Sequence, residues 1–266
     1  MNKFLTAVCI FSLTSSLAVA QPDADELASQ IEAAQAAHLA DINGLTVRTE
    51  MSTPMGDMPS TTRYVKEMKN GQPVLRAVDD DDMNVAGMHD DMLAKLTRHA
   101  SSIQSVRHGG REVFKITVDD ADFLRSMEEL HMGDEMMEDD LDPKEAIAWI
   151  SADDYTVQRM RFVQVGPQGG DVTIDIDFSD YRVHRGLPIA HHMKLSISGI
   201  DQMMSSEDAA MARAQMEQLK AQLEHMPEAQ RAMIEEQLAP QIAQFEQMMS
   251  SGGTDMEIRV VDITVE

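Results

Sequence analysis

The chain has 266 residues and carries 46 Asp and Glu against 22 Lys and Arg, which gives a formal net charge of −24. This acidity disfavours nucleic acids and anionic lipid headgroups as partners, because both are polyanions that the protein would repel. Aromatic residues make up only 4% of the chain and methionine occurs 23 times, so methionine is a main source of large apolar side chains.

The first twenty residues have the pattern of an export signal. Lys3 is the single basic residue, Phe4–Val19 is an apolar run broken only by Ser and Thr, and Ala18–Ala20 supplies the small residues of a cleavage site. The run is too short to span a bilayer, and no other segment approaches that length. We therefore expect a signal peptide at 1–20 and a soluble periplasmic protein that begins at Gln21.

The single cysteine, Cys9, lies within this signal. It is followed by Ile10, and Thr6–Val8 before it does not provide the small-residue context of a lipidated cysteine, so we expect no lipid anchor. The mature chain then has no cysteine, which excludes disulfides, iron–sulfur clusters and thiol catalysis. Its 21 basic and 46 acidic residues give a formal net charge of −25.

The N-terminal half begins with an Ala-rich helix, expected from about Asp23 to Leu39. Three strands should follow in a meander, because apolar and polar residues alternate along them. The predicted strands are Leu45–Met51, Thr61–Met68 and Val74–Val78, with a loop over Pro54–Pro59 between the first two.

Two shorter helices and one strand are expected in the middle of the chain. Met92–Ile103 has helical spacing, Gly109 and Gly110 open a strand over Glu112–Val118, and Asp122–Leu130 is an acidic helical stretch.

The most regular pattern runs from Trp149 to Gly199. From Val172 to Ser179 apolar and polar residues alternate strictly, and the same alternation recurs from Leu187 to Ile197. Two further strands precede these, Ala148–Ser151 and Thr156–Val165, and the Gly166–Gly170 turn leads from the second of them to Val172. Strands joined by such short turns form an antiparallel meander.

A helical hairpin is predicted before the last strand, within an insertion over about 203–250. Its two apolar stripes are separated at Pro227, which is well placed to begin the second helix. The last strand, Met256–Val265, changes its apolar face between Val260 and Val261, as a β-bulge would make it do.

Four segments, Trp149–Met160, Phe178–Val183, Gly186–Met193 and Ile258–Val265, resemble the later strands of the periplasmic outer-membrane lipoprotein-sorting (LolA-like) superfamily. The resemblance implies an unclosed antiparallel barrel around helices, which in several members holds acyl chains. Together with the strand pattern it predicts one α+β domain at 21–266, with about 8–10 strands curved around helices.

The resulting functional hypothesis is a non-enzymatic periplasmic protein that binds an apolar ligand, a lipid or acyl chain, in outer-membrane lipid or lipoprotein handling. Partners would be this apolar molecule and outer-membrane or envelope proteins, and no cofactor is expected. If the concave face is the apolar one, six residues would line the hollow: Ile174, Ile176, Phe178, Met193, Leu195 and Ile197.

Catalytic and metal-binding patterns were weighed against this hypothesis. Paired carboxylates such as Glu128 and Glu129 lie in polar stretches, and His191 and His192 should point to opposite faces of a strand, so they cannot share a metal. Thioether and imidazole ligands suit Cu(I) or Ag(I), which leaves a copper or silver site as the first alternative. Its candidate ligands are Met51, Met55, Met58, Met88, His89 and Met92. The second alternative is a holdase chaperone that offers the Met-lined hairpin to unfolded proteins.

Overall fold

The computed structural model describes residues 22–53, 56–69, 71–78, 92–131, 141–203, 211, 214, 218 and 252–266. The predicted signal peptide lies outside these ranges. The predicted helical hairpin also lies outside them, apart from its first residue and three isolated positions.

The described residues form four helices and ten strands. In chain order these are α1 (Ala24–His38), β1 (Gly44–Thr53), β2 (Gly56–Lys69), β3 (Gln72–Ala77), α2 (Met92–Arg98), β4 (Ser102–His108), β5 (Arg111–Val118), α3 (Ala121–His131), β6 (Asp142–Ser151), β7 (Val157–Val165), β8 (Asp171–His184), β9 (Leu187–Ser198), α4 (Ile200–Met203) and β10 (Gly253–Val265). None of the helices within the described ranges is long and apolar enough to cross a bilayer.

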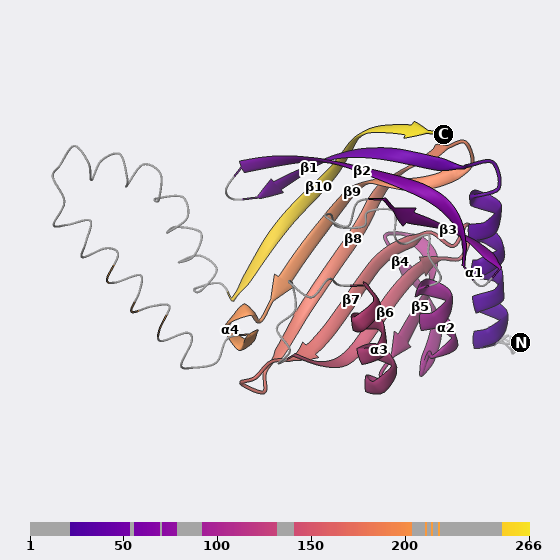
Figure 1. Cartoon of the computed structure of the whole chain (residues 1–266). Helices are drawn as coiled ribbons and strands as arrows, with labels where there is room; N and C mark the ends of the chain where they lie inside the picture. The colour runs from indigo at the N-terminus through magenta and orange to yellow at the C-terminus, as the bar shows by residue number, and fades with distance from the viewer. Residues whose placement is uncertain are drawn as a thin grey trace, which may run out of the picture.

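All ten strands belong to one antiparallel sheet with the order β3-β2-β1-β10-β9-β8-β7-β6-β5-β4. Sequence neighbours pair along each meander, and β10 joins the two meanders by pairing with both β1 and β9. The sheet stays open, with β3 and β4 at its ends, and it bends around the helices (Figure 1). The predicted fold, an unclosed α+β half-barrel of about 8–10 strands, is confirmed.

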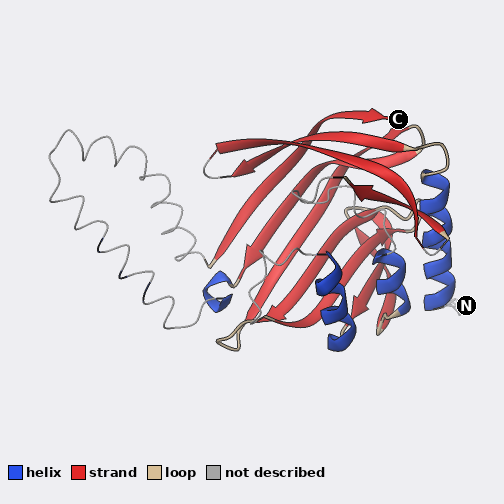
Figure 2. Ribbon diagram, in the orientation of Figure 1, coloured by secondary structure: helices blue, strands red, loops and turns tan. Residues whose placement is uncertain are grey.

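Helices α1, α2 and α3 lie on one side of the sheet (Figure 2). Asp23 caps α1, because its carboxylate accepts hydrogen bonds from the backbone N–H groups of Asp25 and Glu26. Asp120 similarly accepts from the backbone N–H of Phe123 in the first turn of α3. We call the side of the sheet that faces these helices the inner face.

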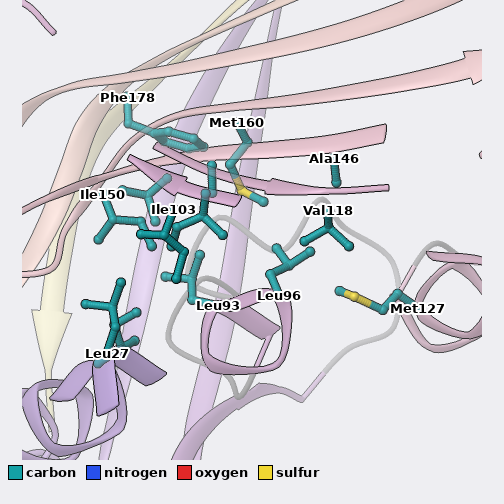
Figure 3. Close-up of a cluster of buried hydrophobic side chains, with 14 of the residues drawn as sticks. Leu27, Leu93, Leu96, Ile103, Val118, Met127, Ala146, Ile150, Met160 and Phe178 are labelled. Carbon is teal, nitrogen blue, oxygen red and sulfur yellow. The ribbon is translucent and has the colours of Figure 1, made fainter. Parts of the chain in front are cut away.

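The larger hydrophobic core lies between the helices and the inner face. Leu27 of α1 and Leu93 and Leu96 of α2 pack there against Met160 of β7 and Phe178 of β8 (Figure 3). A second hydrophobic cluster is formed by residues of β1, β2, β3, β9 and β10 and by two residues that follow α1. It contains Leu39, Ile42, Leu45, Val47, Tyr64, Leu75, Leu187, Ile189 and Val260.

The predicted bulge in the last strand is present. Arg48 pairs with Asp262 and Thr49 pairs with Val260, so Val261 is the extra residue. Val261 is 45% exposed, whereas Val260 before it and Ile263 after it both pack against the second cluster. The bulge therefore keeps the apolar residues of both halves of β10 on the inner face.

The predicted loop over Pro54–Pro59 is wrong for its second half. Strand β2 begins at Gly56, and Pro59 pairs with Glu50 of β1. The proline is tolerated because β3 pairs with β2 only from Tyr64 onward, so Pro59 lies on an open edge of the pair. The Ser52 hydroxyl donates to Asp57 at 2.7 Å and links the two strands near the turn.

The predicted helix over Met92–Ile103 is too long. Helix α2 ends at Arg98, and Ile103 lies in β4 opposite Ile116 of β5. Ile103 fits the helical spacing of Leu93 and Leu96 and equally fits a strand with a buried face. Periodicity therefore could not separate the two states, and strand β4 was missed.

Inserting one Ala after Val261 should destabilise the protein more than substituting Val261. A second extra residue would turn Ile263 and Val265 to the outer face, which should cost about 2 kcal/mol or more of unfolding free energy. Val261→Thr keeps the bulge and an exposed side chain, so its effect should stay within about 0.5 kcal/mol. Chemical denaturation measures both variants, and equal midpoints would contradict this role of the bulge.

Candidate functional site

The six residues predicted to line a hollow share the inner face of β8 and β9. They form three directly opposed pairs, in which Ile174 faces Ile197, Ile176 faces Leu195 and Phe178 faces Met193. Directly opposed residues of antiparallel strands point to the same face of the sheet, with their Cβ atoms about 5 Å apart. The structure therefore brings all six side chains together.

Neighbouring strands extend each pair into a row of uncharged side chains. Register gives three rows across the inner face: Ala146–Phe162–Ile174–Ile197–Thr254, Ala148–Met160–Ile176–Leu195–Met256, and Phe178–Met193–Ile258–Met51–Met58. Phe162 and Met256 were predicted only as strand residues. Met256 stands between Asp255 and Glu257, and this alternation was the signal that could have placed it in the site, whereas Phe162 is followed by the apolar Val163 and has no such signal.

Burial divides the six predicted residues into two groups. Phe178 is 5% exposed and Met193 is 4% exposed, and both belong to the larger core beneath the helices. Ile174, Ile176, Leu195 and Ile197 remain partly exposed, as does Met256 beside Leu195. We call these five residues the inner rim.

The outer face behind the inner rim is charged. Asp175, between Ile174 and Ile176, accepts four hydrogen bonds from the guanidinium groups of Arg159 and Arg161, at 2.7 to 3.0 Å. Arg159 also lies over the ring of Trp149, at 5.4 Å from its centroid. These contacts tie β6, β7 and β8 together and fix the face to which Ile174 and Ile176 point.

The pKa of Asp175 lies below its ordinary value of 3.8. Burial alone would raise this pKa, but the hydrogen bonds and positive charges of Arg161 and Arg159 outweigh that effect. Because the folded state depresses the pKa, the stabilisation by Asp175 is present above pH 3.8. It is lost as the pH falls through the folded-state pKa.

Asp175→Asn should lower the free energy of unfolding by about 1–3 kcal/mol at neutral pH, because two half-buried guanidinium groups lose their carboxylate. Asp171→Asn is the matched control, since its bond to Lys144 is about half exposed and such pairs contribute about 0–1 kcal/mol. Thermal unfolding between pH 7 and pH 2 tests this. A difference from wild type that persists in full at pH 2 would show that the carboxylate charge is not the cause.

The described residues do not support the alternative hypothesis of a copper or silver site formed by methionines. Met51 and Met58 oppose each other in the β1–β2 ladder, and Met51 packs against the larger core, as does Met92 at the start of α2. Met55, Met88 and His89 lie outside the described residues. Met51 and Met58 therefore continue the inner-face row of Phe178 and do not stand in a loop.

Replacing Met51, Met55 and Met58 together by Leu should leave stability within about 1.5 kcal/mol of wild type, because Met and Leu have similar volumes. Ligand content should also stay the same. Competition titration with Cu(I) checks the alternative directly, and tight one-to-one binding that the triple variant loses would restore the copper hypothesis.

The histidines within the described ranges were also compared with the requirements of a metal site. Among the described residues no group of three or more His, Cys, Asp or Glu side chains lies together as a metal site. His191 is 8% exposed and is a buried residue of β9. Its neighbour His192 bonds instead with the Ser179 hydroxyl and lies 3.5 Å from Glu257.

The chain matches no protein-family model and no curated protein. Three solved structures are similar to it. One is a domain assigned to outer membrane lipoprotein-sorting proteins from Vibrio parahaemolyticus, with 9% identity over 92% of this chain and 94% of that chain and a TM-score of 0.42. Another is a DUF1329 family protein from Desulfovibrio piger, with 8% identity over 91% and 92% of the two chains and a TM-score of 0.41. The third is a LolA superfamily protein from Nitrosomonas europaea, with 8% identity over 90% and 93% and a TM-score of 0.34.

All three TM-scores lie below 0.5 and all three identities below 10%, so these similarities carry no argument about this chain. Any ligand has to be argued from the residues of this chain.

Proposed function

We propose that this protein is a non-enzymatic periplasmic binding protein that holds a lipid or acyl chain against the inner rim, in outer-membrane lipid or lipoprotein handling. One observation carries the proposal. Five large apolar side chains from β8, β9 and β10 lie together on the face that also forms the core, and each remains partly exposed.

Contact with an acyl chain would remove this apolar surface from water. Each Å² of apolar surface buried contributes about 25 cal/mol, and the rows around the inner rim contain no charged side chain that a ligand would have to desolvate. Phe162 and Ile176 connect the rim to the larger core. An acyl chain could therefore lie along the rows and continue the packing of the core.

The charge of the protein restricts which part of a lipid it can hold. A formal net charge near −25 repels anionic headgroups, and the outer face bears most of the ion pairs described above. The contact surface on the inner face is apolar. We therefore expect the acyl chain to supply the affinity and the headgroup to remain in water.

A charge placed on the inner rim should remove ligand binding, whereas the same charge on the outer face should not. Ile197 is partly buried on the inner face, and Ser198 beside it is exposed. Ile197→Asp would place a carboxylate against the acyl chain and should weaken binding of a fluorescent fatty acid at least about 10-fold. Ser198→Asp adds the same charge next to it and should bind like wild type at 150 mM salt.

Lipid extraction followed by mass spectrometry of protein purified from the periplasm complements this titration. We expect lipid to copurify with wild type and with Ser198→Asp, and to be depleted from Ile197→Asp. Circular dichroism establishes that both variants are folded. Absence of copurifying lipid from wild type, together with no binding of the fluorescent fatty acid, would eliminate the proposed function.

A further inference from the structure

The tip of the hairpin between β8 and β9, residues 180–191, contains two residues in a strained conformation. Asp180 within β8 has φ +53° and Arg185 in the turn has φ +50°, a left-handed backbone that residues other than glycine rarely adopt. The ladder between the two strands skips Asp180 and resumes where Tyr181 pairs with Ala190. Strained backbone of this kind persists only where surrounding contacts hold it in place.

One side-chain contact holds this tip together. The Nε2 atoms of His184 and His191 lie 2.9 Å apart, and the planes of the two rings are inclined by 12°. This is the geometry of a ring N–H···N hydrogen bond, in which the Nε2–H of one histidine donates to the Nε2 lone pair of the other. His184 pairs with Leu187 at the turn end of the ladder, so the bond spans the turn and the first residues of β9.

This bond can hold one added proton but not two. A first added proton can go to the unprotonated Nδ1 of the donor ring, which leaves the bond intact and makes it charge-assisted. A second proton must occupy the Nε2 that accepts the bond. Two N–H groups on positively charged rings would then face each other, and like charges at this distance repel. The result is the same whichever of His184 and His191 is the donor.

We propose that His184 and His191 form a pH-sensitive switch, which holds the hairpin tip closed with at most one added proton and releases it when a second proton binds. Release would let the two left-handed residues relax. It would also expose Leu187 and Ile189, which are buried in the second cluster between the two histidines of the switch. The switch would make the tip respond to the pH of the surrounding compartment, a property beyond the proposed lipid binding.

The charged groups that face His191 come from β8. Burial and the positive charges of Arg182 and His184 lower the pKa of His191 from its ordinary value of 6.5, whereas the carboxylate of Asp180 raises it. Arg182 donates to Asp180 at 2.6 Å, so these two opposing charges offset each other. Because the closed tip lowers the pKa, its stabilisation is complete above pH 6.5 and is lost as the pH falls through the pKa of the closed form.

Charged groups on the neighbouring strands have other partners. His192, the next residue of β9, bonds with the Ser179 hydroxyl and lies 3.5 Å from Glu257 of β10. Glu257 also accepts from Arg259 at 2.9 Å. Asp262 lies beyond the bulge and is exposed. His192 is therefore a matched control for the switch, because it is an adjacent histidine that takes no part in the ring–ring bond.

The test is hydrogen exchange of the tip amides in the mature protein at pH 7.5 and pH 5.0, corrected for the intrinsic exchange rate at each pH. This range lies above the ordinary pKa values of Asp and Glu, so histidines are the groups that titrate. Protection of the wild-type tip should fall at least about 10-fold, because each proton taken up on opening shifts the equilibrium about 10-fold per pH unit. His184→Gln cannot bind the second proton and should change less than about 2-fold. His192→Gln should behave like wild type.

Titration of the histidine ring protons by nuclear magnetic resonance gives an independent result on wild type alone, which decides the question even if a variant does not fold. The pair should titrate in two separate steps, and the second should coincide with the loss of protection. In folded His184→Gln, His191 should titrate in one step at a higher pH than this second step. Equal protection of the wild-type tip at both pH values, a single step for the pair, or wild-type pH dependence in His184→Gln would overturn the proposal. No lipid enters these measurements, so their failure is distinct from failure of the proposed function.

Discussion

The structure depends on the pairing of β10 with both β1 and β9. Every other pair of adjacent strands is also adjacent in sequence, so without β10 the sheet would fall into two separate meanders. The pairing joins residues about 200 positions apart, and its loop-closure entropy must be offset by burial along the whole strand. The two hydrophobic clusters meet at β10, since Ile258 belongs to one and Val260 to the other.

The bulge in β10 satisfies two requirements at once. Ile258 in the first half of the strand packs in the helix-covered core, and Ile263 in the second half packs against the cluster around Tyr64. These residues are five positions apart, and the extra residue Val261 lets both point to the same face. The same irregularity lies directly after the point where the β9–β10 ladder ends, at His192 and Arg259.

An open sheet has one apolar face that must be covered, and here the coverage is uneven. Helices α1, α2 and α3 bury the part around Phe178 and Met160, where the side chains are nearly inaccessible (Figure 3). The inner rim on β8, β9 and β10 keeps its large aliphatic side chains partly exposed. Leaving such surface in water reduces stability, and a bound apolar molecule would recover it. The outer face of the same strands is charged, with Asp175 between Arg159 and Arg161, so it cannot bind an apolar molecule in the way that the inner rim could.

The sequence by itself determined the elements and their faces, because alternation and capping act over a few residues. The strands around Val172 and Leu187, the helix that begins near Asp23 and the bulge at Val261 were all predicted correctly. The local pattern predicted the wrong element at Ile103, because this residue fits both the helical and the strand period. It also predicted a loop at Pro59, where pairing with β1 extends the strand through a proline. Only the tertiary structure decided that β10 lies between β1 and β9, that Phe178 is buried while Ile174 is partly exposed, and that His191 meets His184. These outcomes depend on contacts between distant segments and on how far the helices reach across the sheet, which no local pattern encodes.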